Sequence, residues 1–333
     1  MRLLRLVADE LDKFNDVNVA TAFSKFGKLS RSRSFPRNIA ADDGFRGLLE
    51  LAREMSADGR FKSRELANVT HSLAKMSVAA RLSADDAGVQ DTLAALEQGV
   101  IPVASDMEPQ DVVTTAWSFA TLGRMPGAEA RAALEAAVVR VAPSMNAQDT
   151  ANQSWALATL GWEPGAEARA ALEDTVVRVA PDMNAQATAN QLWASAKLGW
   201  ELGAEALAAL EIAVVRLAPR MIPQNVSNTV WSFATLGLTP GAETRAALEA
   251  AVLRVAPDPG MKSQEVSNVM WGLATLVWEP GAVAGAALEA AVVRVSPRME
   301  PQHVASILWS YPTLGLTQGA EAGAYARSHF RST

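Results

Sequence analysis

Amide, hydroxyl and carboxyl side chains recur along the chain at a regular interval, and they are the residues best suited to bind a ligand. Asparagine and glutamine offer a hydrogen-bond donor and an acceptor together, so they can pair with the edges of unstacked nucleobases. We predict that three positions of each recurring segment contact such a ligand. The first position holds Asp111, Asp149, Asn225, Glu265 and His303; the second holds Thr114, Asn152, Asn190, Asn228, Asn268 and Ser306; the third holds Thr115, Gln153, Gln191 and Thr229.

The second position has a structural alternative that is equally supported, a ladder of hydrogen bonds between neighbouring segments. The first and third positions change type along the chain, as expected if each segment reads a different base. His71 and His303 have no neighbour in sequence that would complete a metal site or an acid–base pair. No cysteine, phosphate-binding glycine loop or serine elbow is present. We therefore expect no catalysis, no metal and no cofactor.

Arginine also recurs once per segment, within a Val-Val-Arg-Val phrase. A regular row of guanidinium groups could contact successive phosphates. We favour a structural role instead, in which each cation stabilises the negative C-terminal end of the second helix of its own segment. Glutamates on the same predicted helix, such as Glu135, also reduce any positive face. The arginines are Arg140, Arg178, Arg216, Arg254 and Arg294.

A denser group of cations lies between Asp16 and Asp42, where no acidic residue intervenes. We expect this insert to be a mobile loop that could hold a polynucleotide backbone, and simple solvation of the loop explains the charges equally well. The cations are Lys25, Lys28, Arg31, Arg33 and Arg37.

Tryptophan marks the repeat most clearly. Six tryptophans, Trp117, Trp155, Trp193, Trp231, Trp271 and Trp309, follow one another at intervals of 38 residues, with a single interval of 40. Val113 and Ala120 share a helical face with Trp117, so we predict that this series is buried core, with Phe23 and His71 in the same place further upstream. Trp162, Trp200 and Trp278 are better candidates for exposure, although packing between repeats is the simpler expectation for them.

A fixed period of this length is typical of stacked supersecondary units. Each unit is predicted to be two helices: the first starts near a cap such as Asn146 and ends at Gly161, and the second starts after Pro164 and ends before Pro181. We predict an all-α, right-handed solenoid of about eight helix-turn-helix repeats. Residues 1–104 form degenerate repeats with the basic insert and a second insert near Ala79–Asp85, and residues 105–333 form six regular repeats. Met1–Leu11 is expected to be the second helix of a preceding repeat, and the last repeat to end inside its second helix.

Overall charge and hydropathy limit the function. The 333 residues carry a formal net charge of −6, and the whole deficit lies beyond residue 106. Binding to a polyanion must therefore depend on local patches. The longest uncharged run contains amides, prolines and a glycine, so we predict no transmembrane helix.

One phrase, Ala151-Asn-Gln-Ser-Trp-Ala-Leu-Ala-Thr-Leu-Gly161, recurs as Ser227-Asn-Thr-Val-Trp-Ser-Phe-Ala-Thr-Leu-Gly237. With its 38-residue period it resembles the octotricopeptide-repeat proteins of algal organelles, and it is similar to repeats of FAST-kinase-like and RAP-domain proteins. The resemblance implies an α-solenoid that binds single-stranded RNA in a chloroplast or mitochondrion and acts in transcript processing, stability or translation. The alternative is an α-solenoid scaffold that binds protein and no nucleic acid, which the acidic balance favours.

Overall fold

The computed structural model describes residues 2–316, and these residues fold into sixteen α-helices joined by short turns, with no strand among them. Successive helices alternate between two layers, as helix-turn-helix repeats require. The prediction of an all-α helical-repeat solenoid is confirmed for this part of the chain. None of the described helices combines the length and the apolar character that crossing a bilayer would need.

Eight repeats are visible, numbered here from 1 to 8. Their first helices are α2 (Asp16–Leu29), α4 (Ser63–Val78), α6 (Pro109–Thr121), α8 (Ala147–Leu160), α10 (Ala185–Leu198), α12 (Pro223–Thr235), α14 (Ser263–Thr275) and α16 (Pro301–Thr313). Their second helices are α3 (Asp43–Ala57), α5 (Ala87–Val103), α7 (Ala128–Val141), α9 (Ala166–Val179), α11 (Ala204–Leu217), α13 (Ala242–Val255) and α15 (Ala282–Val295). The second helix expected in repeat 8 lies outside the described residues.

Local sequence explains where the helices begin and end. The Asn146 side chain accepts hydrogen bonds from the backbone of Gln148 and Asp149, which caps α8 at its N-terminus. Gly161 ends α8 with φ of 65°, in the left-handed region that glycine enters without steric cost. Proline occupies the first position of α6, α12 and α16, where a missing N–H costs nothing.

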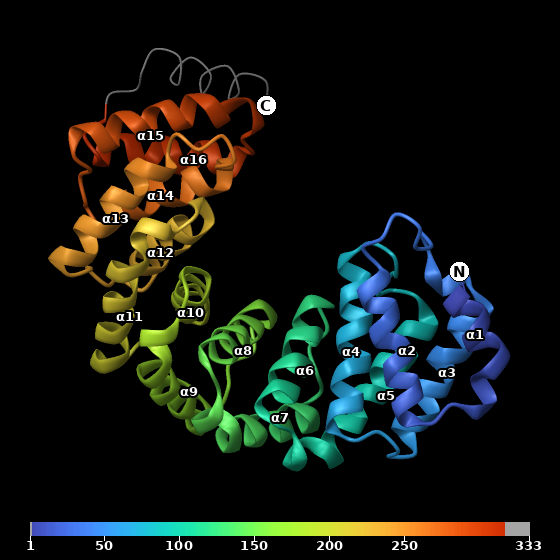
Figure 1. Cartoon of the computed structure of the whole chain (residues 1–333). Helices are drawn as coiled ribbons and strands as arrows, with labels where there is room; N and C mark the ends of the chain where they lie inside the picture. Colours follow the sequence, from blue (N-terminus) through green and yellow to red (C-terminus); the bar gives the residue numbers. More distant parts are fainter. Residues whose placement is uncertain (1, 317–333) are drawn as a thin grey trace. The chain divides into compact units, whose positions relative to one another are not determined.

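The chain divides into two compact units, Met1–Thr175 and Val176–Thr333. Within the first, α2 packs on α4, α4 on α6 and α6 on α8 (Figure 1). Within the second, the same relation joins α10, α12, α14 and α16. In the second unit the first helices contact one another more extensively than the second helices do. In the first unit the same holds for α5 and α7, whereas α3 and α5 pack as extensively as the first helices. The helix α1 (Arg2–Glu10) packs on α3, as the second helix of a preceding repeat would.

Second helices are joined from repeat to repeat by a recurring glutamate. Each carboxylate accepts a hydrogen bond from the backbone N–H of the glycine that precedes the next second helix. Such pairs are Glu97 with Gly127 (2.7 Å), Glu135 with Gly165 (3.0 Å), Glu211 with Gly241 (2.9 Å) and Glu249 with Gly281 (2.8 Å). A carboxylate at a helix N-terminus also interacts favourably with the helix dipole. The repeating glutamates are therefore part of the scaffold.

Candidate functional site

One narrow stripe of each first helix remains accessible, because the helix is covered by its neighbours in the layer and by its own second helix. In repeat 3 the stripe contains Gln110, Thr114, Trp117 and Thr121, spaced by four, three and four residues, so they lie on one side of α6. Gln110 is exposed and the other three are partly buried. We call the corresponding positions of all repeats the amide–Trp face.

The tryptophan series lies on this face, so the prediction that it is buried core is wrong. Trp117, Trp155, Trp193, Trp231 and Trp271 are partly exposed, and Trp309 is 53% exposed. Val113 and Ala120 are buried as predicted. Trp117 belongs to the accessible stripe and borders that buried side, and its side chain is partly exposed. Phe23 does not share this place either: counted from the N-caps Asn15 and Lys62, it corresponds to Thr70, and it is fully buried.

The tryptophans that follow the first helices show the opposite behaviour. Trp162, Trp200 and Trp278 are buried, at 2%, 7% and 3% exposure. The indole N–H of Trp162 donates to Glu135 of the preceding repeat at 2.7 Å, and Arg245 lies 5.0 Å from the ring centroid of Trp278. These residues pack between repeats, which was the simpler of the two expectations for them.

The third predicted position faces the neighbouring first helix rather than solvent. Thr115, Gln153, Gln191 and Thr229 are all at most 1% exposed. Small residues such as Ala116, Ser118 and Ala156 let adjacent first helices approach closely, and the third position falls inside this contact. The prediction that this series lies on a ligand-binding face is therefore wrong.

The first predicted position caps its own helix. Its side chain accepts a hydrogen bond from the backbone N–H three residues earlier, and this geometry is that of a capping box. The acceptors are Asp111 (3.3 Å, from Glu108), Asp149 (3.3 Å, from Asn146), Asn225 (3.3 Å, from Ile222), Glu265 (2.8 Å, from Lys262) and His303 (3.2 Å, from Glu300). Asn225 is also buried. Capping explains why several residue types are accepted here.

The second predicted position does lie on the amide–Trp face. Thr114, Asn152, Asn190, Asn228, Asn268 and Ser306 are all partly exposed. The structure gives the side-chain amides of the four asparagines no hydrogen bond within the protein, so the alternative of a hydrogen-bond ladder between repeats is not observed. These amides remain available to a ligand.

Sequence reasoning missed a second amide series on the same face. Glutamine occupies the position four residues before the second position in every regular repeat, and all six side chains are exposed. The strict recurrence of one residue type at the 38-residue period was the signal that could have identified them. They are Gln110, Gln148, Gln186, Gln224, Gln264 and Gln302.

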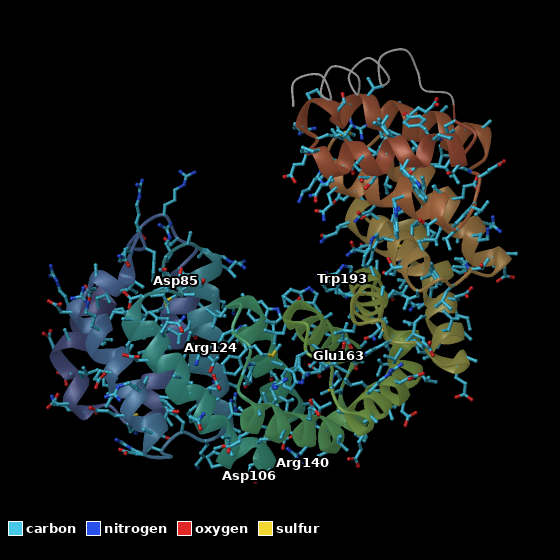
Figure 2. The ribbon with its side chains drawn as sticks, turned by 180° about the vertical axis from the view of Figure 1, so that it is seen from behind. Asp85, Asp106, Arg124, Arg140, Glu163 and Trp193 are labelled. Carbon is cyan, nitrogen blue, oxygen red and sulfur yellow. The ribbon has the colours of Figure 1, made fainter. Side chains whose placement is uncertain are left out.

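The recurring arginines bind backbone carbonyl groups of the preceding repeat. Arg140 donates through Nη2 to the carbonyl oxygens of Ala104 (3.0 Å) and Met107 (2.6 Å), at the C-terminal end of α5, and Figure 2 shows it beside Asp106 in this turn. Arg216, Arg254 and Arg294, in repeats 5, 6 and 7, make equivalent pairs of bonds to the repeat that precedes each of them. The favoured interpretation placed each cation at the C-terminal end of its own second helix, and this placement is wrong: the bonds go to the C-terminal end of the second helix in the preceding repeat. For these four arginines a phosphate ladder is not needed to explain the recurrence.

The basic insert is anchored to the fold rather than free. Phe35 and Ile39 are buried, Ile39 donates its backbone N–H to the carbonyl of Arg81 (3.0 Å), and the Arg81 guanidinium donates back to the carbonyl of Ser30 (3.2 Å). The five predicted cations nevertheless stay exposed, and the structure gives their side chains no salt bridge. They are Lys25, Lys28, Arg31, Arg33 and Arg37.

In the first unit the basic insert and the amide–Trp face are electrostatically connected. Lys75 takes the place of Thr121 on α4, and its pKa is lowered by burial and by the charges of Arg31 and Lys28. His71 takes the place of Trp117, and burial, with a smaller contribution from Lys75, lowers its pKa to about 4. At neutral pH His71 is therefore an uncharged ring beside a row of cations.

Aromatic rings form a short row across the first helices of this unit. The His71 and Trp117 centroids are 5.1 Å apart, and those of Trp117 and Trp155 are 6.4 Å apart. Between them opens a pocket of about 390 Å³ that three first helices line. Its lining residues are His71, Gln110, Val113, Thr114, Trp117, Asn146, Gln148, Asp149 and Asn152.

Within residues 2–316 no three histidine, cysteine, aspartate or glutamate side chains lie close enough to hold a metal ion. Comparison with known proteins gives no match: no protein-family model matches this chain, and neither does any curated protein. The arrangement of side chains on the first helices is thus the basis for any functional conclusion.

Proposed function

We propose that this chain is a single-stranded RNA-binding helical-repeat protein that acts in the processing, stability or translation of transcripts in a chloroplast or mitochondrion. The observation that carries the proposal is the amide–Trp face, on which a glutamine, a small polar residue or asparagine, and a tryptophan recur in each regular repeat. The organellar setting rests on the resemblance to octotricopeptide-repeat proteins. We propose a binding protein rather than an enzyme.

Aromatic rings and free amides are the groups that single-stranded RNA requires of a protein. Base–aromatic stacking contributes roughly 1–3 kcal/mol per base and tolerates any base, whereas amides select among base edges. The partly exposed tryptophans supply the first kind of contact and the unbonded asparagines the second. Duplex nucleic acid offers neither unstacked base faces nor free Watson–Crick edges, so the proposal is specific for single strands.

The backbone of the RNA requires cations, and Lys28, Arg31 and Lys75 of the first unit lie at or just beyond the C-terminal ends of α2 and α4. Lys28, Arg31 and Lys75 lie close enough to one another to lower the pKa of Lys75. Their charge reaches the aromatic row, because Lys75 is close enough to His71 to lower its pKa. A local patch of this kind allows an acidic protein to hold a polyanion.

Binding to random single-stranded RNA pools, followed by sequencing of the retained molecules, tests the proposal. The double variant Trp117→Ala/Trp155→Ala is expected to weaken binding at least about tenfold, because two stacking contacts are lost. Ile212→Ala is the matched control, since it removes a large exposed side chain from the second-helix layer. Absence of retained RNA for the wild-type chain at low salt would reject the proposal.

A protein-binding scaffold is the second candidate, and a specific observation favours it. In the second unit, exposed Ile212 and Val283 lie in shallow grooves of about 630 and 400 Å³ between neighbouring second helices. Exposed apolar side chains of this kind mark protein-interaction surfaces when they are contiguous. Under this alternative Ile212→Ala would weaken partner binding and the tryptophan variants would leave it unchanged.

A further inference from the structure

The pocket on α4, α6 and α8 differs from the rest of the amide–Trp face because it combines an aromatic wall with a carboxylate and several amides. Asp149 is the one acidic residue of its lining. One oxygen of its carboxylate, Oδ2, accepts the capping hydrogen bond from Asn146, and the structure gives the other oxygen no partner. An unoccupied carboxylate oxygen in a pocket is an acceptor for a donor-rich ligand.

Donor groups lie beside this acceptor. The side-chain oxygen of Asn146 already accepts from the backbone of Gln148 (2.8 Å) and Asp149 (2.9 Å), so the group that Asn146 can still offer to a ligand is its NH₂. Asn152 adds a second free amide to the lining. The pocket thus offers an acceptor and donors next to each other.

His71 and Trp117 form the wall of the pocket. His71 is neutral near pH 7, and its Nδ1 is buried without a hydrogen-bond partner. Trp117 is partly exposed and presents an aromatic surface next to it. A flat heteroaromatic ligand is suited to such a wall, because it can stack on the indole while its edge reaches the polar groups.

We infer that this pocket binds one guanine base of a single-stranded RNA, with Asp149 accepting from the adjacent N–H donors of its Watson–Crick edge. The inference rests on the proposed function and adds a base preference to it. Guanine is the standard base with two neighbouring donors on that edge and an acceptor, O6, beside them. The donors match the carboxylate of Asp149, and the acceptor matches the amide NH₂ of Asn146.

Two observations favour guanine over an arginine side chain from a protein, which would also bring donors to a carboxylate. A guanidinium has no acceptor, so the donors of Asn146 and Asn152 would be left without partners. The positive charge of Lys75 lowers the pKa of His71, a residue of the pocket wall, and the same charge disfavours a cationic ligand beside that ring. The same charge attracts the phosphates that accompany a base.

The test compares affinities for short single-stranded RNAs that differ at one position, which carries guanine, inosine, adenine, cytosine or uracil. The wild-type chain is expected to bind the guanine RNA about tenfold more tightly than the adenine RNA, since a carboxylate paired with two donors discriminates by roughly 1–3 kcal/mol. Inosine, which lacks the 2-amino group, should fall between them. Asp149→Asn keeps the shape of the side chain and is expected to reduce the guanine preference to less than about twofold.

Asp111→Asn is the matched control. Asp111 caps α6 with the same 3.3 Å bond that Asp149 makes on α8, has the same degree of exposure and does not line the pocket. Its variant should keep the full guanine preference, and thermal unfolding would show that both variants are folded. RNA binding without any base preference, or equal behaviour of the two variants, would overturn the guanine site while leaving RNA binding in place. If the wild-type chain binds none of the RNAs, or if an arginine-rich peptide binds the pocket and RNA does not, both the guanine site and the proposed RNA-binding function are overturned.

Discussion

Polar atoms buried between neighbouring first helices are the least expected feature at the level of single residues. Thr115, Gln153, Gln191 and Thr229 each place a side-chain oxygen there without a hydrogen-bond partner in the structure. Such atoms reduce stability relative to an apolar side chain of the same shape. Repeats 7 and 8 carry Val269 and Ile307 at this position, which shows that an apolar side chain fits it.

Backbone strain at Val277 gives a first prediction at this scale. Val277 has φ of 49°, in the region where other repeats carry glycine, and its side chain is 74% exposed. A β-branched residue in this conformation costs about 1–2 kcal/mol. We expect Val277→Gly to raise the free energy of unfolding by about 1 kcal/mol in urea titrations. The reverse change, Gly237→Val, should lower it by a similar amount, and equal stability of both variants with wild type would contradict this explanation.

His71 predicts a pH dependence of stability. Its pKa in the folded protein is about 4, below the 6.5 of an ordinary histidine, mainly because of burial and also because of Lys75. The unfolded chain therefore binds a proton first as the pH falls, and stability is lost between about pH 6.5 and 4. Between pH 7 and 5 the loss attributable to His71 should be about 1–2 kcal/mol.

The measurement is urea unfolding of the wild type and of His71→Phe at both pH values. Carboxylates titrate in both proteins, so the difference between the two pH dependences isolates His71. If that difference is zero, the ring is not buried in its neutral form.

At the scale of the element, a second helix is attached to its neighbour mainly through its ends. Glutamate binds the N-terminal end of the next second helix, and arginine binds the C-terminal end of the previous one. From α5 onward, direct packing between second helices is less extensive than between first helices. These bonds are consequently the main polar link between successive second helices. Their role explains why one glutamate and one arginine recur in each regular repeat, while the charges at other positions vary.

Arg216→Ala tests this link. The substitution removes hydrogen bonds to the carbonyl oxygens of Ala180 (3.2 Å) and Met183 (3.0 Å). The guanidinium is exposed to solvent, so we expect a loss of only about 1 kcal/mol in the free energy of unfolding. Arg220→Ala, at an exposed arginine with no side-chain hydrogen bond in the structure, should stay within about 0.5 kcal/mol of wild type. Equal effects of the two substitutions would argue against the link.

At the scale of the whole molecule, charge is distributed unevenly. The net charge of −6 arises beyond residue 106, while exposed cations gather around the insert that follows α2. Under the proposed function this patch would supply most phosphate contacts, and the amide–Trp face would supply base contacts. The two contributions can be separated because phosphate contacts depend on salt and base contacts do not.

Lys28→Ala/Arg31→Ala is therefore expected to weaken binding to all RNA sequences equally. It should also make the slope of log affinity against log salt shallower by about 1.4, which corresponds to two phosphates of a single strand. Affinities measured between about 50 and 200 mM salt provide the slope. The double variant Arg220→Ala/Arg298→Ala removes two exposed arginines outside the patch and should leave the slope unchanged. A change of base preference instead of slope would place Lys28 and Arg31 at base edges.

The sequence by itself determined the elements of this protein. The 38-residue period, the caps such as Asn146 and the glycine at position 161 are local signals, and the helices begin and end where these signals predict. Which face of a first helix stays accessible was decided only by the tertiary structure. The sequence of a single helix shows one periodic pattern of apolar residues. In the stack, the helix is covered by its own second helix and by the first helices on either side, whose residues lie about 38 positions away in the sequence. For that reason Gln153 became buried, Trp155 became accessible, and the pocket beside His71 formed from three repeats that the sequence shows only one after another.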